Sequence, residues 1–365
     1  FGIKRMAQAI GGPASKPLLH TKRDKMGAHG QAVGTTTTNP EEVDAIARRA
    51  WQVIYGGNAS CNNCTVDVFL NKYSDYIYTA APAQLDIISM EQVKSVCVSG
   101  KKNAAGMDGW EPGETALLSD ILYQRIADMF NLIAQGAPWP DATKHARAAF
   151  LAKDPDKADD PLAYRVLMIL STFYRKYMTL RNRSMQAWMD EWTLPEMFAV
   201  GSNGVEDAWY EFAADIEGWD LNETEYAGGT VDIAKCFDQI LRPLVYTLAS
   251  MAGMPVQILE AYRKFQEGLI VHNTISGGVG TGFSRRCGIP QGCPFSMMLT
   301  ALLMRPWVIL AKKMGTCPRI LADDILLLVP GTGMIRKFAN TLSQTHDYLI
   351  DMGAKIAEGK SLNFA

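Results

Sequence analysis

The sequence lacks several features that would place it in a special class of protein. It has no run of about 18 uncharged apolar residues, so we expect no membrane-spanning helix. No signal-peptide pattern stands at the first residue, Phe1, and the missing initial Met suggests a fragment. A surplus of one charge is also lacking, because 36 Lys and Arg oppose 38 Asp and Glu. The resulting net charge of −2 gives no overall signature of nucleic-acid binding.

Cysteine is scarce. The seven cysteines are an odd number in mostly apolar surroundings, which favours reduced thiols and an intracellular, nuclear or cytoplasmic location. Cys61 and Cys64 form a CxxC pair, but structural zinc needs a second pair of ligands, and none lies nearby in the sequence. The role of this pair stays open.

The remaining composition is that of an ordinary globular protein, with 48% hydrophobic residues over 365 positions, enough for one large domain or two. The stretches Asn39 to Glu42 and Ser89 to Gln92 each predict a helix start with a capping box. Further helices are predicted over 114–134, 172–192, 205–216 and 239–251, a strand hairpin over 148–153 and 164–170, and an acidic loop over 218–229. The N-terminal basic run is either a phosphate-binding arm or a tail, and consists of Lys4, Arg5, Lys16, Lys22, Arg23 and Lys25.

Two adjacent carboxylates, Asp323 and Asp324, lie between short apolar runs. This pattern predicts a strand–turn–strand hairpin with the two acids as its polar step. Taken alone, it is more typical of an ordinary exposed turn, because Asp is common in turns. Upstream, Asp232 ends a β-like segment and the Phe237-Asp238 pair opens a helix. Carboxylates from separate strands can hold two Mg²⁺ ions roughly 3.5–4 Å apart, so Asp232 and Asp323 form a candidate metal site, with Asp324 beside them.

A loop punctuated by Gly and Pro, from Gly288 to Ser296, stands between these acids in the sequence. With this loop included, the chain resembles the reverse transcriptase domain of non-LTR (LINE-type) retrotransposons, and group II intron reverse transcriptases are related. The resemblance rests on Asp232 to Asp238 (motif A), Gly288 to Ser296 (motif B) and Ala322 to Asp324 (motif C), in this order.

The resemblance implies an α+β fold of the right-hand polymerase type, with an antiparallel palm sheet backed by helices. We expect an N-terminal extension with one helix in 1–88, fingers in 89–200 and a palm in 201–365, with the thumb missing. The implied cofactor is a pair of Mg²⁺ ions, for which Mn²⁺ can substitute. The implied partners are an RNA template, a DNA or RNA primer and deoxynucleotide triphosphates, and no membrane.

The resemblance also implies roles for individual residues. The catalytic residues are Asp232, Asp323 and Asp324, and the metal contacts are Asp232, Asp323 and the adjacent Ile233. Nucleotide binding falls to Lys153 and Arg165 of the hairpin, Phe237 as the sugar gate, Gln291, and Lys360 in a stretch similar to motif D. Template or primer contacts are expected at Gly292, Lys101 and Lys102.

Local chemistry offers other roles for two of the motif residues. We expect Asp238 to cap or orient the following helix, and Ser296 to cap the helix after motif B.

The implied activity is RNA-directed DNA polymerisation. Two alternatives stay open: a degenerate, inactive copy that only binds nucleic acid, and an RNA-dependent RNA polymerase. Phe237 favours DNA as the product, because a bulky ring at the sugar gate excludes a ribose 2′-hydroxyl.

Overall fold

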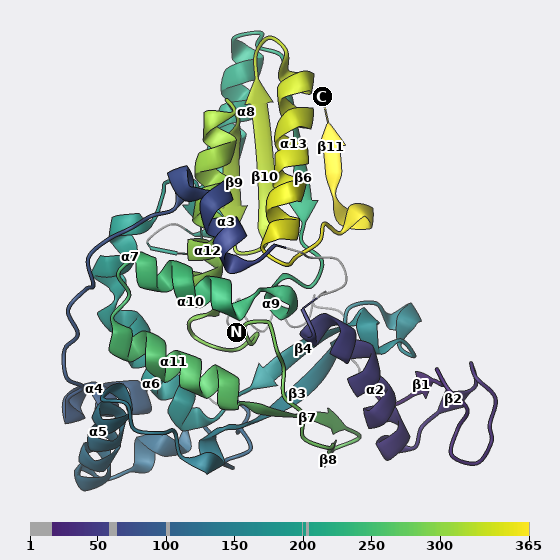
Figure 1. The fold of residues 1–365 in the computed structure, drawn as a ribbon, viewed down its shortest axis with the longest axis vertical. Helices are drawn as coiled ribbons and strands as arrows, with labels where there is room; N and C mark the ends of the chain where they lie inside the picture. Colours follow the sequence, from purple (N-terminus) through teal and green to yellow (C-terminus); the bar gives the residue numbers. More distant parts are fainter. Residues whose placement is uncertain (1–16, 58–63, 100–102, 199, 202–203, 365) are drawn as a thin grey trace, which may run out of the picture.

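The computed structural model describes residues 17–57, 64–99, 103–198, 200–201 and 204–364. These residues form an α+β protein built around a five-stranded sheet and a four-stranded sheet, with a small two-stranded sheet near the N-terminus (Figure 1). The α+β class predicted from the sequence is confirmed. Within the described ranges, no helix is long and apolar enough to cross a membrane.

The five-stranded sheet brings together strands that are far apart in the sequence. Its order is β11-β6-β10-β9-β5, and its neighbours run antiparallel except for β5 and β9. The strands are β5 (Met197–Phe198), β6 (Tyr226–Asp232), β9 (Cys317–Leu321), β10 (Asp324–Pro330) and β11 (Leu362–Phe364). Strand β6 needs glycine at its centre, because a Cβ on Gly229 would lie 2.5 Å from the carbonyl oxygen of Leu362.

Two long helices, α12 (Ser296–Lys313) and α13 (Met334–Asp351), cover one face of this sheet (Figure 1). Side chains alternate between the faces of a strand, and the beginning of β10 follows this rule. Ile325 and Leu327 are buried, whereas Asp324 between the turn and Ile325 is exposed. The first residue of β10 therefore points away from the helical layer.

The four-stranded sheet has the order β4-β3-β7-β8, and β3 pairs with β4 antiparallel and with β7 in parallel. Its strands are β3 (His145–Ala152), β4 (Tyr164–Ile169), β7 (Ile270–Ile275) and β8 (Gly278–Val279). Strand β7 follows residue 201 but pairs in a sheet with β3 and β4, which precede residue 200. Strand β5 precedes residue 200 but belongs to the five-stranded sheet, whose other strands follow residue 201. Each sheet therefore contains a strand from the other side of the predicted boundary between fingers and palm.

The other helices surround these sheets, and aromatic side chains fill the space between several of them. Trp139, Tyr174, Tyr177 and Phe265 are buried, and the ring of Trp139 contacts the other three edge-on. The helices are α2 (Pro40–Tyr55), α3 (Val66–Lys72), α4 (Met90–Val98), α5 (Asp120–Ala134), α6 (Thr172–Ser184), α7 (Gln186–Trp192), α8 (Val205–Leu221), α9 (Cys236–Gln239), α10 (Arg242–Met251) and α11 (Val256–Gly268).

Several predicted helices have different limits. The helix predicted over 172–192 is divided into α6 and α7, and the one over 239–251 starts only at Arg242, where Pro243 occupies the first turn. Helix α8 continues to Leu221 and β6 starts at Tyr226, so most of the predicted loop over 218–229 is regular structure. The prediction of one helix in residues 1–88 was wrong, because α3 follows α2 and begins at a Thr65 side-chain cap.

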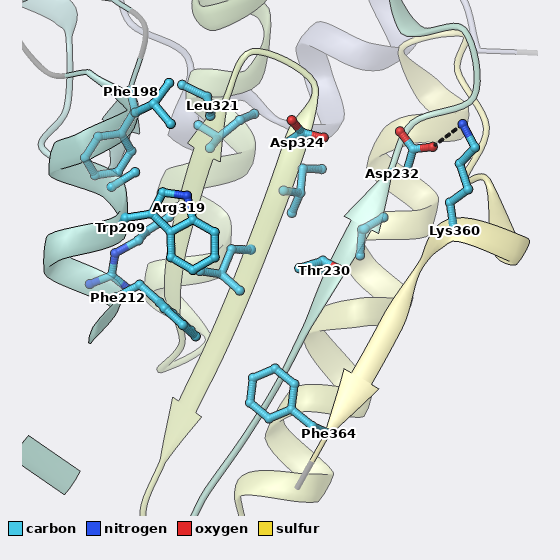
Figure 2. A pocket seen from close by; sticks show the side chains of 16 residues that line it. Phe198, Trp209, Phe212, Thr230, Asp232, Arg319, Leu321, Asp324, Lys360 and Phe364 are labelled. Atoms are coloured by element: carbon cyan, nitrogen blue, oxygen red, sulfur yellow. Dashed lines mark ion pairs between the residues drawn. The ribbon is translucent and has the colours of Figure 1, made fainter. Parts of the chain in front are cut away.

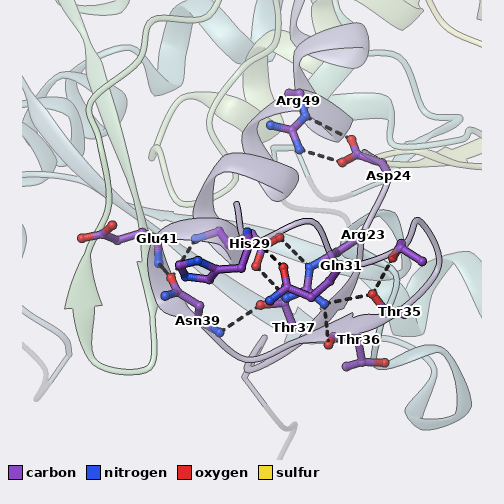
Figure 3. A network of polar contacts seen from close by, with 12 residues as sticks. Arg23, Asp24, His29, Gln31, Thr35, Thr36, Thr37, Asn39, Glu41 and Arg49 are labelled. Carbon is purple, nitrogen blue, oxygen red and sulfur yellow. Dashed lines mark hydrogen bonds and ion pairs between the residues drawn. The ribbon is translucent and has the colours of Figure 1, made fainter. Parts of the chain in front are cut away.

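Before α2, the chain forms the paired strands β1 (Thr21–Lys22) and β2 (Thr36–Thr37). Side chains that follow β1 contact α2 (Figure 3). Arg23 makes a bidentate contact with Glu42 at 2.7 and 3.0 Å, and Arg49 reaches Asp24 at 2.6 Å. Asn39 caps α2 as predicted, but Glu42 pairs with Arg23 rather than completing a capping box. Arg23 is therefore occupied within the protein, while residues 1–16 of the predicted basic arm lie outside the described residues.

Candidate active site

Strands β9 and β10 form the hairpin predicted around the paired acids, but its turn lies one residue earlier than expected. Leu321 and Asp324 are direct partners, so Ala322 and Asp323 are the two turn residues. Ala322 has a φ of +59°, and positive φ at the first turn position is a feature of the two-residue turns that suit β-hairpins. Asp323 therefore lies at the tip of the turn, and Asp324 is the first residue of a strand.

The register of β6 and β10 places two carboxylates side by side. Asp324 is the direct cross-strand partner of Asp232, and α-carbons in such pairs are about 4.5–5.5 Å apart. Figure 2 shows Asp324 and Asp232 at the neighbouring ends of these strands, and an ion pair between Asp232 and Lys360. The ammonium of Lys360 lies 3.5 Å from Asp232 Oδ2. The sequence had suggested Asp232 and Asp323 as the natural pair, whereas the strand register pairs Asp232 with Asp324.

Asp323 is close enough to these acids for their charges to affect it. Burial raises the pKa of Asp323, the like charges of Asp324 and Asp232 add to this shift, and Lys153 opposes it. A divalent cation would relieve this repulsion, and carboxylates are the ligands that Mg²⁺ prefers. Over the described part of the chain, no three Asp, Glu, His or Cys side chains already form a group that could hold a metal ion. The donor chemistry fits Mg²⁺, although the present side-chain positions do not form a complete ligand set.

The charged end of the β3–β4 hairpin lies near the carboxylates. Lys153 directly follows β3, and Arg165 is the second residue of β4, as predicted. Partial removal from water lowers the pKa of Lys153, and Lys360 and Arg165 lower it further, while Asp232 and Asp323 act in the opposite direction. The structure therefore brings Lys153, Arg165 and Lys360 into one electrostatic environment with the acids.

The loop between Gly288 and Ser296 contacts both α9 and β4. The main-chain carbonyl of Gln291 accepts a hydrogen bond from the main-chain N–H of Met168 in β4. The side-chain amide of Gln291 lies 3.4 Å from Asp238 Oδ2 in α9. Gly292 has a φ of +123°, and a Cβ there would lie 2.5 Å from the carbonyl oxygen of Met168. Gly292 therefore lies close against the backbone of β4, and its expected contact with template or primer stays a prediction. Phe237, the predicted sugar gate, is half-buried on α9, next to Asp238.

Two predicted capping roles were wrong. Asp238 lies inside α9 and is buried, and the cap of α10 is Leu241. Burial raises the pKa of Asp238 to about 6, against the opposing charges of Arg285 and Lys235. Ser296 is the first residue of α12 rather than its cap, and its hydroxyl donates to the carbonyl of Pro290.

Other predicted site residues have more restricted roles. Ile233 is buried and forms a β-bridge with Ile356, so only its main-chain carbonyl could contact a metal. Lys101, Lys102 and Cys61 lie outside the described residues. Cys64 is described, and its partly buried thiol lies 3.6 Å from the carbonyl oxygen of Thr65, the cap of α3.

A cavity of about 410 Å³ lies between α8 and the sheet face that bears the carboxylates (Figure 2). Asp232, Asp324 and Lys360 border it at one end, and Trp209 of α8 forms part of its apolar wall. Arg319 of β9 is largely buried there and holds α8 through Asp215, at 2.6 Å.

None of the protein-family models matches the chain, and no curated protein shows significant similarity.

Sequence reasoning missed one residue of this region, Lys235. It lies between Asp232 and Phe237, has a φ of +48°, and its ammonium reaches the carbonyl oxygen of Leu162 at 2.7 Å. The available signal was a lone cation inside a stretch otherwise made of acids and apolar residues.

Proposed function

We propose that this chain is an RNA-directed DNA polymerase that transfers nucleotides onto a primer 3′-hydroxyl. One observation supports the proposal above the others: Asp232 and Asp324 are cross-strand partners, and Lys153, Arg165 and Lys360 share their environment. Carboxylates and basic side chains that come together from separate strands fit a reaction between a metal-bound triphosphate and a hydroxyl. In this proposal the five-stranded sheet is the palm, and the β3–β4 hairpin belongs to the fingers.

The acids would hold two Mg²⁺ ions. Asp232 and Asp323 are the expected ligands, with Asp324 in support and the carbonyl of Ile233 as a further candidate. When bound, Mg²⁺ lowers the cost of ionising the primer hydroxyl and neutralises charge that develops on the phosphates. The protein's part is to hold these carboxylates at the ends of adjacent strands.

The basic side chains would bind the incoming nucleotide. Lys153 offers a point charge and Arg165 a planar fork, and both suit phosphate oxygens. Lys360 contacts Asp232 and is exposed, so it can serve either the carboxylate or a phosphate. These three residues come from the β3–β4 hairpin and the C-terminal segment before β11.

The product would be DNA because of Phe237. Its ring is half-buried on α9, and α9 is connected to the loop that contains Gln291 and Gly292. In this proposal the bulky ring at this position excludes a 2′-hydroxyl on the incoming sugar. Gln291 and Gly292 would support the new base pair from the loop.

Primer extension on an RNA template tests the proposal. The unchanged chain, an Asp323→Asn variant and an Asp347→Asn variant are compared in Mg²⁺ and in Mn²⁺. Asp347 is an exposed acid on α13, so the control makes the same chemical change away from the site. We expect extension by the unchanged chain and by Asp347→Asn, and a loss on the order of a hundredfold or more in Asp323→Asn. Equal extension by Asp323→Asn, or none by the unchanged chain in either metal, would contradict the proposal.

A further inference from the structure

Lys235 has a backbone conformation that its side chain does not favour. It stands between the end of β6 and the beginning of α9, with φ +48° and ψ +44°. A residue with a Cβ is uncommon in this left-handed region, whereas glycine enters it without strain. If only the turn from β6 into α9 mattered, glycine would adopt this conformation with less strain than lysine. A lysine at this position calls for an explanation from what its side chain touches.

The side chain of Lys235 crosses from the larger sheet to the β3–β4 hairpin. Its ammonium donates to the carbonyl oxygens of Leu162, at 2.7 Å, and Tyr164, at 3.4 Å. It also lies 4.2 Å from the ring centre of Trp51 in α2, a distance typical of cation–π contacts. The indole of Trp51 in turn donates to the carbonyl of Pro161, at 3.0 Å. Two donors thus hold the same short segment, 161–164.

This segment leads directly into Arg165. Tyr164 is the first residue of β4 and is buried, so the backbone held by Lys235 determines where the next side chain begins. On the opposite strand, the N–H of Lys153 donates to the carbonyl of Ala163, inside the same segment, at 3.3 Å. Both hairpin cations therefore depend on the position of residues 161–164.

The charges around Lys235 link it to the same region. Burial lowers the pKa of Lys235 to about 8, Asp238 opposes this shift, and Lys153 and Lys360 add to it. A partly buried ammonium beside two like charges is held by its carbonyl and aromatic partners rather than by a salt bridge. Its position is therefore fixed mainly by the hairpin and by α2.

We propose that Lys235 is a positioning residue that holds segment 161–164 against the end of β6, and thereby places Arg165 and Lys153 beside Asp232. The role of the two cations in triphosphate binding rests on the proposed function. The contact between Lys235 and the hairpin does not rest on it, so the two can be tested separately.

The test compares Lys235→Gly, Lys235→Met and Lys235→Arg with the unchanged chain. Glycine relieves the left-handed backbone and removes the side chain, methionine keeps a long side chain without a donor, and arginine keeps donor and charge. Hydrogen exchange of the amides in 152–168 is measured for each variant, together with kcat and KM for a deoxynucleotide triphosphate in primer extension. Urea unfolding shows which variants are folded, and the readouts are taken on those.

We expect faster exchange in this range for Lys235→Gly and Lys235→Met, with recovery in Lys235→Arg. We also expect KM to rise about tenfold or more in the first two variants while kcat stays within about twofold, as follows from losing hydrogen bonds of a charged donor. Unchanged exchange in the glycine and methionine variants would overturn the proposal whatever the activity. Faster exchange with an unchanged KM would overturn its link to the triphosphate. If the unchanged chain extends no primer, the proposed function fails, and the exchange rates still decide the structural contact.

Discussion

Replacing Asp238 by asparagine should stabilise the fold at neutral pH. The carboxyl of Asp238 is buried, and burial raises its pKa from 3.8 to about 6. The folded chain therefore holds this proton more tightly than the unfolded chain does. The resulting stabilisation is fully present below about pH 3.8 and is lost as the pH rises through about 6. Above that pH, the fold contains a buried carboxylate that asparagine would not ionise.

The size of the effect follows from the two pKa values. With a shift from 3.8 to about 6, ionisation of Asp238 lowers the free energy of unfolding, relative to the protonated side chain, by about 1.6 kcal/mol at pH 5 and about 3 kcal/mol at pH 8. Asparagine keeps an oxygen that can accept from the Gln291 amide, which lies 3.4 Å from Asp238 Oδ2. The free energy of unfolding of Asp238→Asn, relative to the unchanged chain, should thus increase by about 1.4 kcal/mol between pH 5 and pH 8.

Urea unfolding at several pH values between 5 and 8 measures this difference. The control is Asp347→Asn, because Asp347 is exposed and surface substitutions of this kind usually change stability by less than about 0.5 kcal/mol. Parallel stability curves for Asp238→Asn and the unchanged chain would refute the reasoning. The reasoning would also fail if the free energy of unfolding of Asp238→Asn, relative to that of the unchanged chain, were lower at pH 8 than at pH 5.

Three further predictions concern the loop, the sugar gate and the exposed cation. Gly292→Ala should lower the free energy of unfolding by at least about 1 kcal/mol more than Gly315→Ala. Both glycines have positive φ, but only at Gly292 would the new Cβ meet backbone, so equal losses in urea unfolding would show that the close approach is unimportant. Phe237→Ala should let ribonucleotides be incorporated in primer extension, and unchanged sugar selectivity would remove Phe237 from the gate. Lys360→Met should tighten Mn²⁺ binding, measured by electron paramagnetic resonance, because Lys360 now contacts the Asp232 carboxylate; weaker or unchanged binding would contradict this competition.

Features set by neighbouring residues could be predicted from the sequence. The capping box of Ser89 and Gln92 is present, and the acidic hairpin differs from the prediction by one residue in its turn. Both depend on contacts within a few positions, so the residue types alone indicate them. The β3–β4 hairpin is also present, with Lys153 directly after β3 and Arg165 in β4.

Features set by distant contacts could not be predicted in this way. The pairing of Asp232 with Asp324 depends on the register between strands separated by more than eighty residues in the sequence. A register shift by one residue would place one of the two carboxylates on the opposite face of the sheet. The parallel pairing of β3 with β7 is similarly remote, and it crosses the predicted domain boundary. The contacts of Lys235 with Leu162, Tyr164 and Trp51 also join residues far apart in the sequence, so no local pattern could reveal them.

Iron-directed cleavage maps a metal bound between β6 and the β9–β10 turn without requiring activity. Fe²⁺ replaces Mg²⁺, and radicals formed at the ion cut the nearby backbone, after which mass spectrometry locates the cuts. We expect cuts close to residue 232 and to residues 323–324, suppression of both by excess Mg²⁺, and loss of both in Asp232→Asn but not in Asp347→Asn. Cuts confined to other segments, or cuts at 323–324 that persist undiminished in Asp232→Asn, would contradict a metal site shared by these strands.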